Sequence, residues 1–366
     1  SSTDSAAVTA DVYPVTVGDL TLDAQPTSII SLSPTATEML FAIGAGDQVV
    51  AVDEYSNYPA EAVALGTKLS GYEPNIEAIS TLAQDKLVPL CQQSVVVTQG
   101  FIGSDEAGNT TTLGRGGSDY SAALIAESVK AAGLEIWTDV PGIYTTDPRI
   151  APKASPIPEI SFSEASEMAN FGAKILHPST LVPALRHDIP VFVGSSKEPE
   201  KGGTWIRHQV ESSPLFRALA LRCNQTMVTL RSANMFHAYG FLAKVFEILA
   251  KHKISVDLIT TSEISVSLTL DQTDTSGGAP QLPQAVREEL EELCKVEVEH
   301  DLCLVALIGN NMSESKGYAK QVFGTLEDFN LRMICYGASP HNLCFLLHES
   351  VSKQAIQKLH TELFEK

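Results

Sequence analysis

The residues with the clearest potential to bind an anion lie in the stretch 110–119, which reads TTTLGRGGSD. Glycines at positions 114, 116 and 117 allow backbone N–H groups to converge on a phosphate or a carboxylate. Arg115 can hold either group with two parallel hydrogen bonds, and Ser118 or Asp119 is expected to cap the helix that follows. A glycine-rich turn is weak evidence on its own, so a flexible loop before a helix is the alternative.

A second set of polar side chains follows an expected strand that begins at residue 134. The strand ends at Thr138 and Asp139, and a Pro-Gly turn then leads to Tyr144 and Arg149. Because α/β folds bind ligands beyond the carboxyl ends of their strands, Tyr144 could flank a base and Arg149 could meet a phosphate. The alternative is an ordinary turn with an exposed arginine.

The elements around these residues are those of an α/β domain. Residues 94–98, SVVVT, form a β-branched run that predicts a buried strand before the glycine-rich turn, and residues 120–129 predict the helix after it. A capping box from Ser161 to Glu164 predicts a second helix. Lys174 follows that helix, where a lone lysine would ordinarily be a solvated surface residue.

Composition excludes several classes of partner. The chain of 366 residues has a formal net charge of −19, which argues against nucleic acid and against an anionic membrane. No apolar run approaches the ~18 residues that a membrane span needs, and we expect no cleavable leader. The six cysteines show neither CxxC spacing nor a cluster with histidine, so reduced thiols, no metal centre and a cytoplasmic location are expected.

Charge is distributed unevenly along the chain. Residues 1–80 carry eleven acidic side chains and a single basic one, Lys68, so we place a domain boundary after residue 82. A strand at 29–32, a helix from Pro34 and a strand at 48–52 predict a βαβ unit in this segment. The run IISLSPTATEMLFAIGAGDQVVAVDEYSNYPAEA resembles the start of a class III periplasmic solute-binding protein of the vitamin B12 and siderophore importer type, over residues 14–80.

The C-terminal part contains an internal repeat at an offset of 77 residues. Gly240, followed by Val245 and Phe246, corresponds to Gly317, followed by Val322 and Phe323, and the agreement continues without gaps. Each copy predicts the order strand, helix, strand, strand, helix. A helix on one face of an antiparallel sheet is an α+β sandwich, so residues 216–366 are expected to form two such modules.

Four motifs in the central part resemble those of aspartokinases, most closely the lysine-inhibited type. They are TQGFIG, TTTLGRGGSD, TDVPGIYTTDPR and FGAKILHP, in this order. The resemblance implies an α/β fold consisting of a partial amino-acid-kinase domain at 83–215 and two α+β modules at 216–366, preceded by the βαβ fragment at 1–82. It also implies transfer of the ATP γ-phosphoryl group to the side-chain carboxylate of L-aspartate, with Mg²⁺ neutralising charge.

The resemblance assigns roles to the residues introduced above. Asp119 would organise the catalytic centre, and Arg115 and Ser118 would hold the substrate aspartate. The residues expected to line the nucleotide site are Thr138, Asp139, Tyr144, Arg149 and Lys174.

Both C-terminal copies resemble ACT domains, which sense amino acids in biosynthetic enzymes. In lysine-sensitive aspartokinases the first copy binds lysine, and a homodimer through the ACT domains is expected. The effector-binding candidates implied by this resemblance are Met235, Phe241, Leu242, Ser255, Val256, Asp257, Ser262 and Glu263. Asp257 or Glu263 could hold the amino groups of lysine, whereas Ala238 replaces a serine that is usual in the loop. The alternatives are core packing for the apolar members and a strand-end turn for Ser262.

One departure from the aspartokinase pattern bears on activity. The family opens with a Lys-Phe-Gly-Gly-Thr strand whose lysine stabilises the transferred phosphate, and these 366 residues do not contain that motif. Lys-Gly-Gly-Thr occurs at 201–204, where no apolar strand directly precedes it, and we expect a surface turn there. The sequence therefore predicts an aspartate kinase with impaired catalysis. A non-catalytic lysine-sensing module is the first alternative, and a periplasmic solute-binding protein is the second.

Overall fold

The structure is a computed structural model that describes residues 14–365, apart from 18–19, 23, 26, 54–55, 66–67, 70–86, 93, 105–109, 115, 173–177, 233–238 and 272–278. The chain divides into two compact units. The first unit comprises residues 1–142 and 176–208, and the second comprises residues 143–175 and 209–366. The second unit therefore takes a segment from the middle of the predicted kinase domain.

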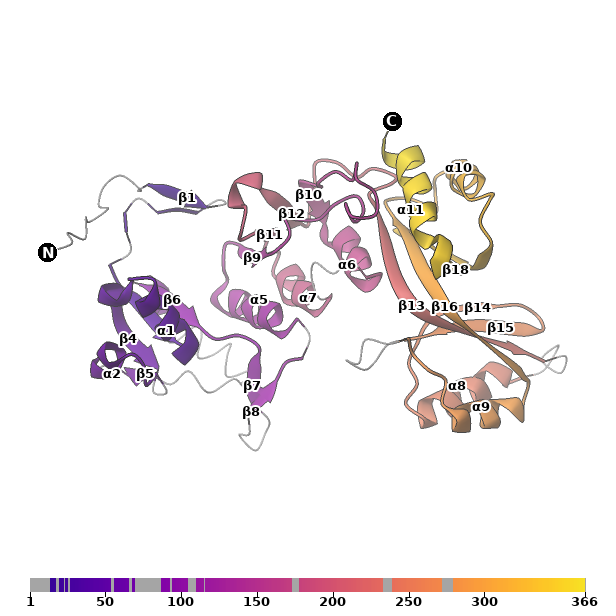
Figure 1. Cartoon of the computed structure of the whole chain (residues 1–366), viewed down its shortest axis with the longest axis horizontal. Helices are drawn as coiled ribbons and strands as arrows, with labels where there is room; N and C mark the ends of the chain where they lie inside the picture. The colour runs from indigo at the N-terminus through magenta and orange to yellow at the C-terminus, as the bar shows by residue number, and fades with distance from the viewer. Residues whose placement is uncertain are drawn as a thin grey trace, which may run out of the picture. The chain divides into compact units, whose positions relative to one another are not determined.

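A four-stranded parallel sheet occupies the beginning of the first unit (Figure 1). Its strands, in spatial order, are β5 (Lys68–Leu69), β4 (Val49–Asp53), β3 (Ile29–Leu32) and β6 (Val95–Thr98). The associated helices are α1 (Pro34–Ala42), η1 (Gly46–Gln48), α2 (Ala60–Ala64) and α4 (Val88–Cys91). Ile29, Val49, Val52 and Ala62 form a small buried core. The βαβ unit is present, and its strand β3 pairs directly with β6, so one sheet includes residues on both sides of the boundary predicted near 82.

The rest of the first unit contains the glycine-rich turn. Two small hairpins, β1 (Val15–Val17) with β2 (Leu20–Leu22) and β7 (Ile102–Ser104) with β8 (Thr110–Thr112), accompany the helices α5 (Gly117–Val129) and α7 (Pro178–Arg186). Strand β9 (Leu134–Thr138) runs parallel to β11 (Val191–Ser195), which pairs antiparallel with β12 (Gly203–Arg207) after η3 (Pro199–Lys201). The ring of Phe192 lies 5.3 Å from that of Trp137 and 5.1 Å from that of Trp205, so an aromatic cluster fixes these three strands.

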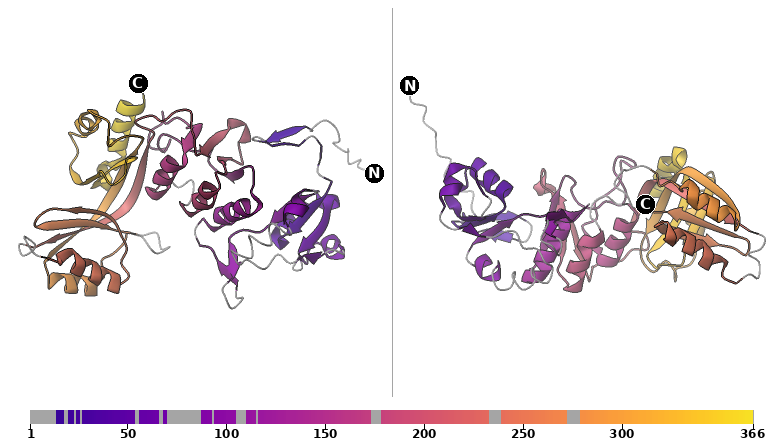
Figure 2. Two further views of the ribbon diagram at one scale, coloured as in Figure 1. Left: turned by 180° about the vertical axis from the view of Figure 1, so that it is seen from behind. Right: turned by 90° about the horizontal axis from the view of Figure 1, so that it is seen from below.

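The second unit is built on a six-stranded antiparallel sheet. In spatial order its strands are β14 (Val256–Thr261), β15 (Ser265–Leu270), β13 (Ala218–Arg231), β16 (Lys295–Ile308), β18 (Asn342–His348) and β17 (Leu331–Tyr336). Its helices are α6 (Phe162–Asn170), α8 (Phe241–Lys251), α9 (Gln284–Glu291), α10 (Tyr318–Thr325) and α11 (Glu349–Phe364), and the short strand β10 (Glu159–Ser161) precedes α6. The pairs α8–α9 and α10–α11 lie toward opposite ends of the long strands β13 and β16 (Figures 1 and 2).

The 77-residue repeat is confirmed by these elements. The strands β13 and β16 are each 14 residues long, and their first residues lie 77 positions apart. Both repeats then begin a helix after a glycine in the left-handed region, Gly240 at φ 83° and Gly317 at φ 86°, a conformation that costs glycine little. Each repeat has its own core, with Val245 and Leu249 of α8 in one, and Val322 of α10 and the following Leu326 in the other.

Several predicted bounds differ from the structure. The helix expected from residue 120 begins at Gly117, and its N-cap is Gly116 rather than Ser118 or Asp119. Strand β13 is 14 residues long, and its pairing with β16 contains two register shifts, one on each side of Gln225. The capping box from Ser161 to Glu164 is confirmed. Among the described helices, none is long and apolar enough to cross a membrane.

Candidate functional site

The glycine-rich turn is closed mainly by its own backbone. Gly114 and Gly116 have φ angles of 75° and 73°, and the N–H of Gly117 donates to the carbonyl of Gly114 over 3.0 Å. The expectation that all three glycines direct their amides at an anion is therefore wrong for Gly117. A side chain at position 117 would come within 2.9 Å of Leu113, which explains why a glycine is needed there. Arg115, expected to hold aspartate, lies outside the described residues.

Helix α5 places the remaining candidates of this turn in its first turn. Ser118 is exposed, and Asp119 is partly buried. The loop before the turn is tied to the helix, since the N–H of Phe101 donates to Ser121 Oγ over 3.0 Å. A carboxylate in the first turn of a helix interacts favourably with the helix dipole, which gives Asp119 a structural role beside any catalytic one.

The end of strand β9 carries the first nucleotide candidates. Thr138 Oγ1 donates to Asp139 Oδ1 over 3.2 Å, and Asp139 is exposed. Ser196 follows the neighbouring strand β11, and both its N–H and its hydroxyl donate to the Thr138 carbonyl, over 2.8 and 3.0 Å. The carboxyl ends of two parallel strands are thus joined at Thr138, in the place where α/β sheets bind ligands. Ser196 is a residue that the sequence analysis did not single out.

Tyr144 and Arg149 lie in the second unit, in a segment closed on itself that we call the 143–157 loop. Its two ends are joined by the hydrogen bond from the Ile157 N–H to the Ile143 carbonyl, at 2.8 Å, and Tyr144 forms an isolated β-bridge with Pro156. Arg149 forms a bidentate ion pair with Asp147, through Nε at 3.0 Å and Nη2 at 2.7 Å, and its side chain is 86% exposed. An exposed guanidinium on a closed loop can bind a phosphate at little cost in desolvation.

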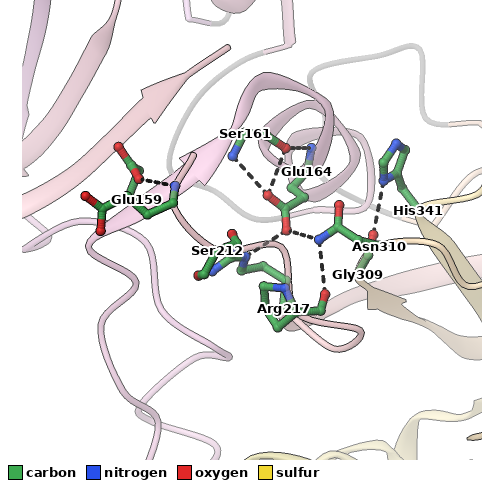
Figure 3. Close-up of polar contacts among 10 residues, drawn as sticks. Glu159, Ser161, Glu164, Ser212, Arg217, Gly309, Asn310 and His341 are labelled. Atoms are coloured by element: carbon green, nitrogen blue, oxygen red, sulfur yellow. Dashed lines mark hydrogen bonds and ion pairs between the residues drawn. The ribbon is translucent and has the colours of Figure 1, made fainter. Parts of the chain in front are cut away.

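Helix α6 leads toward Lys174, which itself lies outside the described residues. A buried carboxylate holds this helix: Arg217 Nε and Asn310 Nδ2 donate to Glu164 Oε1 over 2.7 and 2.6 Å, and the Ser161 hydroxyl donates to Oε2 over 2.8 Å (Figure 3). Burial by itself raises the pKa of Glu164, but the hydrogen bonds from Arg217, Ser161 and Asn310 outweigh it and hold the pKa below its ordinary value of 4.5. The carboxylate therefore joins α6 to the ends of β13 and β16.

A second glutamate on α6 extends this attachment. Glu167 lies one turn after Glu164, and it accepts hydrogen bonds from Ser339 Oγ at 2.5 Å and from Asn342 Nδ2 at 2.8 Å. In the sequence, Glu164 is recognisable only as part of a capping box, and its distant partners are not indicated. The one indication of these contacts in the sequence is the spacing of the two glutamates, which lie three residues apart and therefore on one face of the helix.

Asp257 is paired within its own unit. Its carboxylate contacts the guanidinium of Arg222 on β13, and each of the two side chains is one-quarter exposed. The Nη1 of Arg222 also donates to the carbonyl of Asn170, at the end of α6, over 3.2 Å. Asp257 is therefore paired, although the residue as a whole is exposed, so the alternative of a strand-end aspartate without a ligand stays open. Arg222 is a further residue that the sequence did not indicate.

The other effector candidates have varied surroundings. Ser255 Oγ donates to Asp271 over 3.2 Å, whereas the Ser262 hydroxyl lies 2.7 Å from that of Ser265 in the turn between β14 and β15. Phe241 and Val256 pack against the core of the first repeat, as the core alternative predicts. Leu242 and Glu263 are exposed, and Met235 and Ala238 lie outside the described residues. The expected strand-end turn at Ser262 is thus present.

The surface turn expected at the internal Lys-Gly-Gly-Thr is only partly correct, because Gly203 and the buried Thr204 begin strand β12, whereas Lys201 lies at the surface. Its ammonium group is 2.7 Å from Glu198, and its side chain is 54% exposed. Among the described residues, no group of three or more histidine, cysteine, aspartate or glutamate side chains could hold a metal ion.

Family models match both parts of the chain. The model of the amino acid kinase family matches residues 35–195, and an ACT domain model matches residues 228–284 and 305–363. With the folds described above, these matches define an amino-acid kinase domain followed by tandem ACT domains. The kinase match begins at residue 35, and so it does not support the resemblance of residues 14–80 to a solute-binding protein.

Two solved structures and one curated relative show which family of amino-acid kinases the chain resembles. The crystal structure of E. coli aspartokinase III in complex with lysine and aspartate is 53% identical, has a TM-score of 0.69, and is matched over 92% of this chain and 70% of that chain. The same enzyme in complex with aspartate and ADP is 62% identical, with a TM-score of 0.72, over 80% of this chain and 66% of that chain. This chain belongs to the aspartokinase family.

The curated lysine-sensitive aspartokinase 3 of Escherichia coli (strain K12) is 62% identical over 294 residues. That alignment covers 80% of this chain and 66% of the relative, so the chain spans slightly less than two thirds of the relative's length.

Proposed function

We propose that the chain is an aspartate kinase, which transfers the ATP γ-phosphoryl group to the side-chain carboxylate of L-aspartate under feedback control by L-lysine. The observation that carries this proposal is the 53% identity, over most of the chain, to an aspartokinase solved with lysine and aspartate. Support for a nucleotide comes from the related structure solved with aspartate and ADP. A biosynthetic kinase of this kind would act in the cytoplasm.

The proposed substrate site consists of Arg115, Ser118 and Asp119 at the start of α5. The residues proposed to bind the nucleotide are Thr138, Asp139, Tyr144, Arg149 and Lys174. The residues fit a Mg²⁺ that arrives with the nucleotide, because Mg²⁺ is commonly held by one or two carboxylates together with substrate phosphates. When bound, the metal would neutralise charge on the transferred phosphoryl group.

The proposed effector site is centred on Asp257, whose carboxylate is the type of group that pairs with an ammonium. A homodimer through the ACT domains is also proposed. Phe246 on α8 and Ile259 on the edge strand β14 are each 40% exposed, and exposed apolar side chains of this size are suited to an interface between copies.

Calorimetry with ADP in Mg²⁺, and separately with L-lysine, tests the proposal. Binding of both ligands supports a lysine-regulated kinase. Binding of lysine without ADP would favour the second candidate function, a non-catalytic lysine-sensing module, for which the two ACT matches at residues 228–284 and 305–363 are the specific observation. Binding of neither ligand at millimolar concentration would contradict both.

A further inference from the structure

Helix α11, the C-terminal helix of the second repeat, is attached to the 143–157 loop through a chain of polar contacts. His360 is 1% exposed; its Nδ1 lies 3.1 Å from Glu365 Oε1, and its Nε2 lies 2.9 Å from Thr145 Oγ1. A carboxylate can only accept, so Nδ1 carries a proton and donates to Glu365. The imidazole thus joins the Thr145 hydroxyl of the loop to the carboxylate that follows the helix.

The chain closes on the loop at a second point. Glu365 Oε2 forms an ion pair with Lys153 Nζ over 2.8 Å, and the N–H of Ser155 donates to Thr145 Oγ1 over 3.1 Å. The hydrogen bonds from Lys153 and His360 hold the pKa of Glu365 below its ordinary value, so the carboxylate stays charged near neutral pH. Loop residues on both sides of Arg149 are thus held by one carboxylate.

Two further hydrogen bonds hold the 143–157 loop. Gln357 Nε2 donates to the carbonyl of Ile150 over 2.8 Å, and the Ile150 side chain packs against the core of the second repeat. The Leu219 N–H of β13 donates to the Thr145 carbonyl over 2.7 Å. Ile150 is the residue directly after Arg149, so the backbone that carries the exposed arginine is fixed by α11.

We propose that His360 is a positioning residue for nucleotide binding. Through Thr145 it holds the 143–157 loop in the conformation in which Tyr144 and Arg149 receive a nucleoside di- or triphosphate, and the second ACT repeat is thereby part of the scaffold of the nucleotide site. This inference rests on the proposed kinase function, because it takes the nucleotide role of Tyr144 and Arg149 from that proposal.

The test combines two measurements on Thr145→Val and His360→Gln. Valine keeps the shape of threonine and removes the hydroxyl, whereas glutamine can place a nitrogen near the position of Nε2. Thr145→Ser retains the hydroxyl and serves as the rescue variant. Lys358→Met is the matched control, because it breaks an ion pair of the same helix with Asp328, at 2.6 Å, that does not involve the loop.

Hydrogen exchange without nucleotide is measured first. The backbone amides of residues 145 and 157 are expected to exchange faster in Thr145→Val than in the unmodified chain. In Thr145→Ser and Lys358→Met they are expected to exchange as in the unmodified chain. ADP titration in Mg²⁺ follows, with binding about tenfold weaker in Thr145→Val, the factor expected if the competent loop conformation falls to about one tenth of the population. His360→Gln should lie between the unmodified chain and Thr145→Val.

Two results would overturn the positioning role alone. One is unchanged loop exchange in Thr145→Val, and the other is faster exchange with ADP affinity equal to that of the unmodified chain, which would mean a merely structural contact. An unmodified chain that binds no ADP at millimolar concentration would instead refute the nucleotide role assigned in the proposed function, and the positioning role with it.

Discussion

Single side chains join the middle of the kinase sequence to the regulatory repeats, and Glu164 is the most informative of them. It is fully buried, yet its pKa is lowered, because four hydrogen bonds from three residues favour the charged form more than burial disfavours it. Such a group stabilises the folded state above its unfolded pKa, and this stabilisation is lost as pH falls through the lower folded pKa.

The first prediction concerns this carboxylate. Glu164→Gln leaves the buried guanidinium of Arg217 without its counter-charge, so the free energy of unfolding should fall by about 3–5 kcal/mol at pH 7. The loss of stability that the unmodified chain shows on acidification below about pH 4.5 should be smaller in the variant. Denaturant unfolding across this pH range is the measurement. Glu198→Gln, which breaks a half-exposed pair, should change stability by less than about 1 kcal/mol, and an equal effect of both variants would contradict the prediction.

The second prediction concerns Asp257. If its carboxylate receives an ammonium group of lysine, Asp257→Ala should abolish the rise in melting temperature that lysine causes in the unmodified chain. Because Asp257 contacts Arg222, whose guanidinium is largely buried, the lysine-free melting temperature should also fall, by a few degrees. Differential scanning fluorimetry with and without lysine checks both effects. A lysine-induced rise that survives in Asp257→Ala would place the effector elsewhere.

Among the elements, the N-terminal sheet and the long antiparallel sheet differ in how much core supports them. The buried core of the N-terminal sheet includes Ile29, Val49, Val52 and Ala62, whereas the core of the second repeat extends over three strands and two helices. Local stability follows the amount of buried apolar contact. We therefore expect different opening free energies, although β3 is paired on both sides.

The third prediction states this for hydrogen exchange. Amides of β3 and β4 should exchange faster than those of β13 and β16 under native conditions, because a small parallel sheet buries little apolar surface. Equal protection in the two sheets would contradict it and would indicate that residues 29–53 open only with the rest of the molecule.

Local sequence signals predicted elements more successfully than contacts. The repeat was detectable because apolar periodicity recurs at a constant offset, and the capping box of α6 was detectable because Ser161 and Glu164 are three residues apart. Contacts between distant residues left no such signal: Arg217 lies 53 residues from Glu164, and His360 lies 215 residues from Thr145. The N-cap of α5 was misplaced because serine and aspartate are common caps, whereas the turn ends in a left-handed glycine.

For the whole molecule, the division into two units separates the candidate site residues. Asp119, Thr138 and Asp139 belong to the first unit, and Tyr144 and Arg149 belong to the second, with the regulatory repeats. The domain bounds predicted at 82 and 215 stay predictions.

The fourth prediction concerns turnover by the 366-residue polypeptide. ATP-dependent formation of aspartyl phosphate, trapped as the hydroxamate, should be at least about 10²-fold slower than that of E. coli aspartokinase 3 assayed beside it. The reason is that the polypeptide contains no Lys-Phe-Gly-Gly-Thr, and loss of one electrostatic stabiliser of a transition state typically costs about 10²–10³ in rate. Comparable rates that disappear in Arg115→Ala would show that catalysis is intact.

The most direct test of a lysine-regulated nucleotide site is the affinity of the unmodified chain for ADP in Mg²⁺, measured calorimetrically with and without saturating L-lysine. Coupling between two sites is reciprocal and typically amounts to about 5–150-fold. ADP binding should weaken within that range when lysine is present, and the lysine effect should be absent in Asp257→Ala. Equal ADP affinity at zero and saturating lysine, in a chain that binds both ligands, would contradict feedback control through the nucleotide site.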